Sequence, residues 1–574
     1  MILLPAFSLM AGLAEQFEDY QYARWGEGVM LTGYTGAGGD LVIPGLIEGL
    51  PVLAIGDLAF RNHAELTRVS IPASVTRIGR GAFNYCEGLG RVTIPGSVDL
   101  IAESAFASCP SLVEVTLGEG ITEIGNQAFA HCRSLAGITI PGSVRVFGTR
   151  VLSDCTGLTR VTLREGVSEL GRSMFLGCTG LKEVSLPVTV VDIAAEAFYG
   201  CRSLTRITLP IYLNSLGKGA FTFCTGLSNI TLPDSVVTID DEAFFGCTGL
   251  AEMTLPDSVN FVGKRVFWYC PSLTRVTMSD GVTTIQEGTF LGCTGLTEIT
   301  LPAHVGSIGA RAFAHCVSLA GIALPDGVAT IEAEAFFGCT GLTQITLPNT
   351  VDALGESAFR DCLALNRVVL SDGILRIEAD TFHGCTRLTE ITLPAHLTHI
   401  GVRAFSDCTG LADLTLPDSL EGIGDDAFLD CGSLAEITLP EGLAAIGSGA
   451  FAGCGSLLEV TIPTGLTDFG AGALESCTRL SAIHVDPANP SFRSVEGVLF
   501  TDSLDTLLAV SRRQSRCLSG VGRGDDHRGP GLSGMHGDHR GLACFRSHRD
   551  WRLRIRGMHG SSRREYSRHR DKYR

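Results

Sequence analysis

The sequence predicts a β-rich repeat solenoid with one short helical turn in each coil. Cysteine recurs every 23 residues, eighteen times, from Cys86 to Cys477, and His63 occupies the same position one period earlier. A fixed period of this length is typical of solenoids, in which each repeat is one coil stacked on its neighbour. The unbroken period therefore predicts about 19 coils. It favours an extended binding surface over an enclosed catalytic pocket.

Each period contains a strand pattern followed by turn signals. Over residues 296–301, apolar side chains alternate with polar ones, as in a half-buried strand. Pro302 has no backbone N–H, so the strand is expected to end there. Gly309 opens a turn, and the run 312–316 predicts a single helical turn before the next strand.

Two further positions of the repeat supply a core. The residue three before the cysteine is Phe in nearly every coil, with Leu152 and Leu474 as exceptions, and the residue three after it is Leu throughout. Only neighbouring coils can cover these side chains. The apolar surroundings of the cysteine favour a column of buried, inert thiols. Disulfides between adjacent coils are the alternative, since a spacing of about 4.8 Å lies within their range.

The repeat pattern L-x-x-I-x-L-P-x-x-V-x-x-I-G-x-x-A-F-x-x-C resembles the BspA-like leucine-rich repeat family over roughly residues 18–510. Residues 34–52 are similar to the amino-terminal capping segment of that family, and residues 485–500 to the hairpin that interrupts its repeats. The resemblance implies a leucine-rich-repeat solenoid. It also implies a surface or secreted adhesion protein that binds a host protein, matrix or another cell.

The pattern divides the chain into five expected parts. An apolar segment, a remnant of a signal peptide or else a hydrophobic cap, comes first. An amino-terminal cap, the solenoid, a β-hairpin insertion and a tail follow it. The expected bounds are 1–17 for the apolar segment, 18–54 for the cap, 55–485 for the solenoid, 486–510 for the hairpin and 511–574 for the tail.

The tail 511–574 is expected to be a frameshift product without a packed core. It holds 17 Lys+Arg and 6 Asp+Glu, a net charge of +11, whereas the rest holds 27 against 55, a net charge of −28. The sequence 534–537, Gly-Met-His-Gly, recurs 23 residues later at 557–560. Read one base along, its codons permit Cys-Thr-Gly, the signature found at 293–295. The alternative is a genuine disordered Arg-rich arm.

Composition and motifs argue against catalysis and against nucleic-acid binding. Lys and Arg are scarce in residues 1–510, so sequence-independent phosphate binding is not expected. The chain contains no Gly-x-x-x-x-Gly-Lys loop, no His-Glu-x-x-His and no Cys-x-x-Cys. We therefore expect no enzyme activity, cofactor or metal site. No apolar run reaches the length of about 18 residues that a membrane span needs, so no membrane insertion is expected.

Two surface patterns are the candidate binding sites. A threonine ribbon is expected on one sheet face, although Thr also simply suits strands. An aromatic cluster fills the two positions before the cysteine, which are usually small or polar, as at 153–154 and 452–453. Its rings could instead pack on the turn and thicken the core. The ribbon comprises Thr208, Thr231, Thr254, Thr277 and Thr300; the cluster comprises Tyr199, Phe223, Phe245, Trp268 and Tyr269, with Tyr212 expected nearby.

The sequence thus predicts a non-enzymatic adhesion protein, at the cell surface or secreted, that binds a protein or glycan through its extended solenoid surface. An intracellular scaffold that docks other proteins is the alternative. The partner and the oligomeric state are not specified by the sequence.

Overall fold

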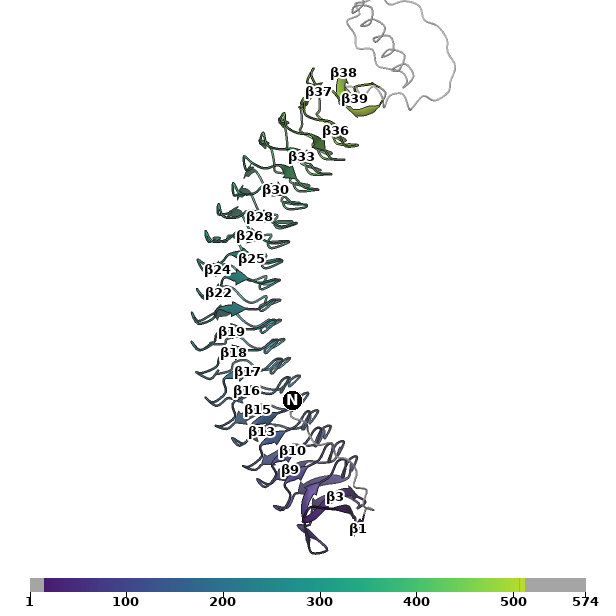
Figure 1. Cartoon of the computed structure of the whole chain (residues 1–574), viewed down its shortest axis with the longest axis vertical. Coiled ribbons are helices and arrows are strands. Elements are labelled where there is room, and N and C mark those ends of the chain that lie inside the picture. The colour runs from purple at the N-terminus through teal and green to yellow at the C-terminus, as the bar shows by residue number, and fades with distance from the viewer. Residues whose placement is uncertain (1–14, 505, 512–574) are drawn as a thin grey trace, which may run out of the picture. The chain divides into compact units, whose positions relative to one another are not determined.

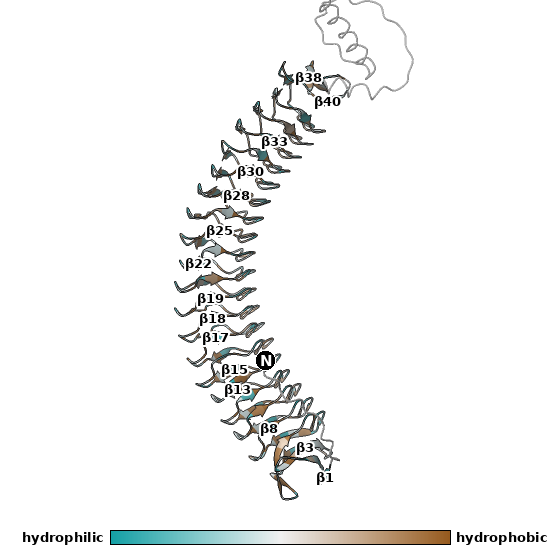
Figure 2. Ribbon diagram, in the orientation of Figure 1, coloured by the Kyte–Doolittle hydropathy of each residue, from teal (hydrophilic) through white to brown (hydrophobic). Residues whose placement is uncertain are grey.

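The computed structural model describes residues 15–504 and 506–511, which form two units divided after Val328. In both units the coils lie one on the next as successive rungs (Figure 1). The apolar and polar segments alternate within each coil, as the hydropathy colours of Figure 2 show. The expected solenoid is therefore the observed architecture.

Unit 1 begins with a cap in which the chain runs antiparallel before the coils start. The first three strands pair antiparallel, and the third then pairs in parallel with the sixth. The ring of Tyr34 lies 5.3 Å from those of Phe60 and His63 in the first coil, so the cap continues the aromatic core. The strands are β1 (Glu15–Phe17), β2 (Tyr20–Trp25), β3 (Gly28–Tyr34), β4 (Gly39–Val42), β5 (Leu46–Ile47) and β6 (Leu50–Ile55).

The coils of unit 1 are joined by two parallel strand ladders. In register, residue i of one coil pairs with residue i+23 of the next, as in Arg275 with Glu298. The first ladder is β7 (Leu66–Ser70), β9 (Arg91–Ile94), β11 (Glu114–Leu117), β13 (Gly137–Ile140), β15 (Arg160–Leu163), β16 (Glu183–Ser185), β20 (Glu252–Thr254), β22 (Arg275–Thr277) and β24 (Glu298–Thr300). The second is β8 (Arg77–Ile78), β10 (Leu100–Ile101), β12 (Glu123–Ile124), β14 (Val146–Phe147), β17 (Asp192–Ile193), β18 (Ser215–Leu216), β19 (Thr238–Ile239), β21 (Phe261–Val262), β23 (Thr284–Ile285) and β25 (Ser307–Ile308).

Unit 2 repeats the two ladders and ends in a small antiparallel sheet. Its first ladder contains β27 (Gln344–Thr346), β29 (Arg367–Val369), β31 (Glu390–Thr392), β35 (Glu459–Ile462) and β37 (Ala482–Val485). Its second contains β26 (Thr330–Ile331), β28 (Ala353–Leu354), β30 (Arg376–Ile377), β32 (His399–Ile400), β33 (Gly422–Ile423), β34 (Ala445–Ile446) and β36 (Asp468–Phe469). The antiparallel sheet is β38 (Phe492–Val495), β39 (Val498–Thr501) and β40 (Leu507–Val510).

Asn489 attaches this antiparallel sheet to the last coils of unit 2. Its buried amide nitrogen donates to the carbonyls of Pro463 and Leu466, at 2.6 and 3.0 Å. Its side-chain oxygen accepts from the backbone N–H groups of Ser491 and Phe492. All the polar atoms of one buried side chain are thereby used to turn the chain out of the repeat.

The prediction of a helical turn in each coil is wrong, because the described residues contain turns and no helix. The backbone φ is positive at the positions five and one before the cysteine, for example 57° at Arg265 and 58° at Tyr269, and a right-handed helix excludes such values. The N–H groups of Arg265, Phe267 and Tyr269 donate to carbonyls of the next coil at 2.8–2.9 Å. The N–H of Trp268 bonds back to Arg265 within the turn. The turn segment is therefore a third inter-coil ladder.

The core of each unit consists of columns of identical side chains. From Phe198 to Phe313 the rings stack nearly parallel, with centroids 5.2–5.7 Å apart and interplanar angles of 4–12°. Leu152 fills the Phe position between Phe129 and Phe175 and is equally buried. The columns follow from the 23-residue register, because it places each side chain above the equivalent side chain of the neighbouring coil.

The column of cysteines adopts the free-thiol form. All eighteen cysteines from Cys86 to Cys477 are free and buried. The Sγ of Cys293 lies 3.0 Å from the carbonyl of Phe267 in the preceding coil, so the thiol is a donor between coils. Burial raises the pKa of Cys293 to about 12 and that of Cys477 to about 11. These thiols are therefore protonated and unreactive at neutral pH.

Truncation of a core ring should destabilise the solenoid locally. In Phe290→Ala, the loss of a ring packed between Phe267 and Phe313 should lower the free energy of unfolding by about 3–5 kcal/mol. Hydrogen exchange should show lost protection centred on the flanking coils, because contacts are nearest-neighbour. Thr300→Ala, at an exposed position, is the control and should change stability by about 0.5 kcal/mol or less. Lost protection confined to the cap would contradict the stacking argument.

The cysteines should resist thiol reagents until the chain unfolds. Peptide-mass analysis after alkylation at pH 7.5 should show no native-state labelling of the eighteen column cysteines apart from slow reaction at Cys477, because burial raises its pKa only to about 11, against about 12 for Cys293 and Cys431. Cys517 and Cys544 lie outside the described residues and are left out of this readout. Since the folded thiols hold their protons where unfolded ones lose them, stability should fall as the pH rises above about 9. Mass losses of two daltons per pair without reductant would instead reveal disulfides.

Candidate binding surface

The structure brings four of the five predicted cluster residues into one continuous chain of ring contacts. Tyr199 meets Phe223 edge-on at 5.6 Å, Phe223 meets Phe245 at 4.8 Å, and Phe245 stacks on Trp268 at 4.6 Å. All four side chains are half-buried. The aromatic cluster therefore spans four successive coils of unit 1 and keeps part of every ring accessible to a partner.

Two further predicted residues lie outside this chain of contacts. Tyr269 adjoins Trp268 in sequence and is 56% exposed, with no ring contact to the cluster in the described part of unit 1. Tyr212 is 63% exposed and lies on the turn before β18. The structure brings its ring into no contact with the cluster, and the second strand follows that turn in the chain before the aromatic positions are reached.

The backbone of the repeat favours glycine at one of the two aromatic positions. The residue just before the cysteine has a positive φ, which costs a side chain with a Cβ about 1–2 kcal/mol. Phe223 and Tyr269 occupy this position with φ of 57° and 58°. Folding of the repeat does not require aromatic rings there. In seven coils the same position, again at positive φ, is Gly177, Gly200, Gly246, Gly292, Gly338, Gly384 or Gly453.

The guanidinium group of Arg265, which was not among the predicted site residues, contacts the ring of Trp268. The guanidinium carbon of Arg265 lies 5.6 Å from the centroid of the Trp268 ring, a cation–π geometry. Arg265 also pairs with Glu287, which Lys264 approaches with its Nζ at 3.1 Å. The hydrogen bond from Lys264 lowers the pKa of Glu287, so this carboxylate stays charged. The sequence signal was present, because Arg265 lies three residues before Trp268 in the same turn.

The threonine ribbon is exposed and partly in register. Thr254, Thr277 and Thr300 pair in sequence order across β20, β22 and β24. Thr208 and Thr231 lie in two coils whose first segment has no assigned strand, and all five side chains are exposed. The neighbouring charges pair with each other; the Nε of Arg275 lies 3.0 Å from a carboxylate oxygen of Glu298. These cross-strand pairs are what a stable sheet needs.

A shallow groove of about 530 Å³ opens where the first strand ladder of unit 1 is interrupted. It lies between the segments 228–234 and 251–256, and Thr231 and Thr254 of the ribbon face each other across it. Asn229 and Glu252 add an amide and a carboxylate to its lining. The ribbon is therefore hollowed between these two coils.

A model of the BspA-type leucine-rich repeat region, built of six copies, matches residues 53–182, 153–274, 260–388, 306–434 and 375–504. The chain belongs to this family. Together the matches span the coils of both units and the first two strands, β38 and β39, of the antiparallel sheet after them. No curated protein matches the sequence.

Solved leucine-rich repeat proteins of bacteria resemble this BspA-type chain. One from Bacteroides ovatus is 30% identical over 66% of this chain and 100% of its own, with a TM-score of 0.58. The T. pallidum leucine-rich repeat protein is 34% identical over 33% of this chain and 90% of its own, with a TM-score of 0.31. A leucine-rich cell surface protein from Faecalibacterium prausnitzii is 23% identical over 83% and 95%, with a TM-score of 0.32.

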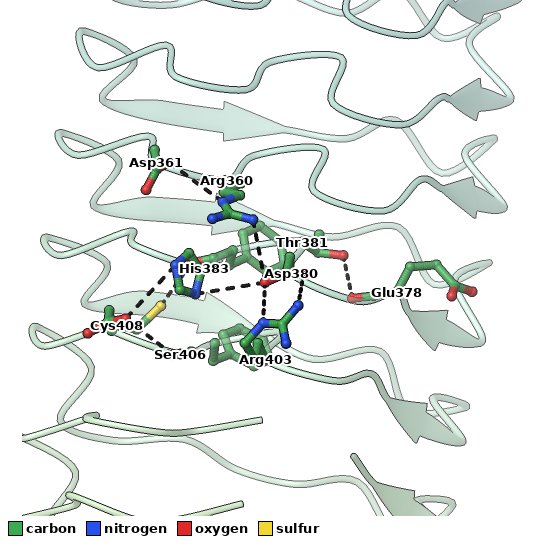
Figure 3. Close-up of polar contacts among 12 residues, drawn as sticks. Arg360, Asp361, Glu378, Asp380, Thr381, His383, Arg403, Ser406 and Cys408 are labelled. Carbon is green, nitrogen blue, oxygen red and sulfur yellow. Dashed lines mark hydrogen bonds and ion pairs between the residues drawn. The ribbon is translucent and has the colours of Figure 1, made fainter. Parts of the chain in front are cut away.

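Unit 2 of this BspA-type solenoid contains a buried charge cluster that the sequence analysis also missed (Figure 3). The carboxylate of Asp380 is buried and accepts two hydrogen bonds from Arg403, at 2.9 and 2.8 Å. Arg360 and His383 approach the same carboxylate at 3.8 and 3.9 Å. The bond to Asp380 raises the pKa of Arg403. The carboxylate of Asp380 is thus paired within the coils, whereas the side chains of Arg403 and Arg360 are partly exposed.

Among the described residues, no group of three or more His, Cys, Asp or Glu side chains is arranged to hold a metal ion. The same part of the chain has no helix long and apolar enough to cross a membrane. The aromatic cluster, the threonine ribbon and its groove are accessible features of the described coils.

Replacing the exposed ring by glycine should separate a binding role from a folding role. Tyr269→Gly should leave the melting temperature unchanged or raise it, because Gly adopts φ near 58° without strain. Tyr85→Gly is the matched control, since Tyr85 has the same repeat position, a φ of 58° and 47% exposure, outside the cluster. Calorimetry should show both variants behaving alike. A fall of several degrees in Tyr269→Gly alone would show that this ring stabilises the fold.

Proposed function

We propose that the protein is a non-enzymatic adhesion protein that binds a protein or glycan partner through the aromatic cluster of unit 1. The observation that carries the proposal is the continuous chain of ring contacts from Tyr199 to Trp268, in which part of every ring stays accessible. The repeat folds without these rings, since the same two positions hold small residues such as Ala452 and Gly453 in another coil.

The chemistry of the cluster fits recognition by contact. Tyr, Trp and Arg are the residues that contribute most to binding at protein interfaces. Trp268, Tyr269 and Arg265 supply all three types within one turn. Exposed ring faces also accept the apolar faces of sugars, and the neighbouring Lys264 and Glu287 offer a donor and an acceptor. Protein and glycan partners therefore share this site in the proposal.

The threonine ribbon and its groove form the second part of the proposed surface. Its hydroxyls, with the amide of Asn229 and the carboxylate of Glu252, give a polar lining suited to hydrogen bonding. Because cross-strand pairs such as Arg275 with Glu298 already explain the ribbon as sheet chemistry, we assign it a smaller share of the binding energy.

A double substitution in the cluster tests the proposal. Trp268→Ala with Tyr269→Ala should weaken binding at least tenfold, or about 1.4 kcal/mol, because it removes the largest accessible rings. Binding of the purified chain to immobilised matrix proteins and to an oligosaccharide array measures the effect, with melting temperature recorded in parallel. Tyr85→Ala is the matched control and should bind like the parent. Unchanged binding by the double variant, or early melting, would make the cluster structural.

The location that we propose is the cell surface or the exterior, and an intracellular scaffold is the alternative. Protease treatment of intact source cells separates the two, because a surface protein is cleaved while a cytoplasmic one is spared. The scaffold would still use the same cluster, so the double variant and the protease experiment answer different questions.

A further inference from the structure

The carboxy-terminal end of the last coil leaves the turn ladder of unit 2 open. In the coil before it, the N–H groups of Gly449, Phe451 and Gly453 donate to carbonyls of the last coil at 2.8–3.0 Å. One period later the equivalent donors belong to Gly472, Leu474 and Ser476. Within residues 15–504 and 506–511, none of these three N–H groups has an acceptor. Three backbone donors at alternate residues are thus presented together.

The apolar core is also opened at this end. Seventeen cysteines of the column have no accessible surface, whereas Cys477 is 7% exposed. A groove of about 590 Å³ lies beside it, between residues 472–478 and strand β40. Leu474 lines the groove from the last coil, and Leu507, exposed to solvent, lines it from β40. The groove therefore combines an apolar lining with the unpaired donors.

The direction of the hydrogen bonds determines what can fill this place. In the turn ladder each coil donates N–H groups towards the next coil and offers carbonyls to the preceding one. A second copy of the same end would bring N–H donors against N–H donors. A symmetric end-to-end dimer would therefore leave these hydrogen bonds unmade. The first coil of a second copy is unsuitable as well, because the cap covers it with Tyr34 against Phe60. The complementary surface is the carbonyl face of an uncapped coil.

We propose that the carboxy-terminal end of the last coil docks one further coil of the same repeat. The gene encodes this coil after codon 511, in the reading frame that begins one base later than the frame of the present sequence. In that frame the codons of Met535 and His536 give cysteine followed by a codon that permits threonine, and the codon of Leu532 permits phenylalanine three residues before that cysteine. The codons of His527 and Arg528 permit Ile-Gly eight residues before it. Ile78-Gly79 stands at the same distance before Cys86.

The new coil would supply carbonyls for the three open donors. Its phenylalanine would continue the aromatic position now held by Leu474, and its cysteine would cover Cys477. The inference rests on the open ladder and the shifted codons and is independent of the proposed adhesion function.

Hydrogen exchange on the full chain tests the docking. One base is deleted within codons 511–526, so that the codon of Met535 is read as cysteine. Peptides covering 470–478 should then exchange at least about tenfold more slowly than in the present chain, because a hydrogen-bonded amide exchanges only when the coil opens. Peptides covering 447–455 contain donors that are already paired, and they should stay protected in both chains as a control for folding. Alkylation of Cys477 should fall in parallel.

Two further chains make the result decisive. Deletion of two bases gives a tail in the third frame and should leave 470–478 unprotected. Replacement of residues 512–574 by a copy of the chain's own period 440–462 should protect it, whatever the shifted frame encodes. Protection in the third-frame chain, or in the present chain, would overturn the proposal. If the copied period protects residues 470–478 and the one-base deletion does not, the shifted frame does not encode the docking coil.

Discussion

The backbone hydrogen bonding between successive coils is the interaction on which the rest of this structure depends. Most coils meet the next through two short parallel strands, and successive coils are also joined by the turn segment, whose alternate N–H groups donate to the following coil. Strands of two residues are too short to be stable alone, so their stability comes from the stack. The same register places Phe on Phe and Cys on Cys, which makes the core a set of columns.

This dependence on backbone hydrogen bonds explains which positions of the repeat tolerate sequence variation and which groups the solenoid presents at its surface. Since the turn ladder uses only backbone atoms, the residue before the cysteine is free to vary, and Gly, Asp, His, Phe and Tyr all occur there at positive φ. Variation at this position reaches the surface without disturbing the columns. Phe223 and Tyr269 of the proposed binding site are examples. At Gly472, Leu474 and Ser476 the backbone N–H groups of the turn ladder themselves are presented at the end of the last coil, without an acceptor among the described residues.

Much of the fold and part of the site could be predicted from the sequence. The 23-residue period gave the stacked coils and the buried thiols, and it placed Tyr199, Phe223, Phe245 and Trp268 at adjacent rungs. The helical turn was wrong, because apolar spacing at 312, 313 and 316 does not reveal the positive φ of Arg311 and His315. Tyr212 makes no ring contact with the cluster, and the linear order of residues within a coil does not state which corner its turn occupies.

The sequence by itself determined which residues lie above one another, because a fixed period forces equivalent positions into register whatever the coil's exact path. Only the tertiary structure decided how the path of one coil runs, and so which side chains from different positions meet. The Arg265–Trp268 contact and the approach of Arg360 to Asp380 both join non-equivalent positions of the repeat. Such contacts depend on the φ values and directions of the turn, and those are set by hydrogen bonds that a coil makes only with its neighbours.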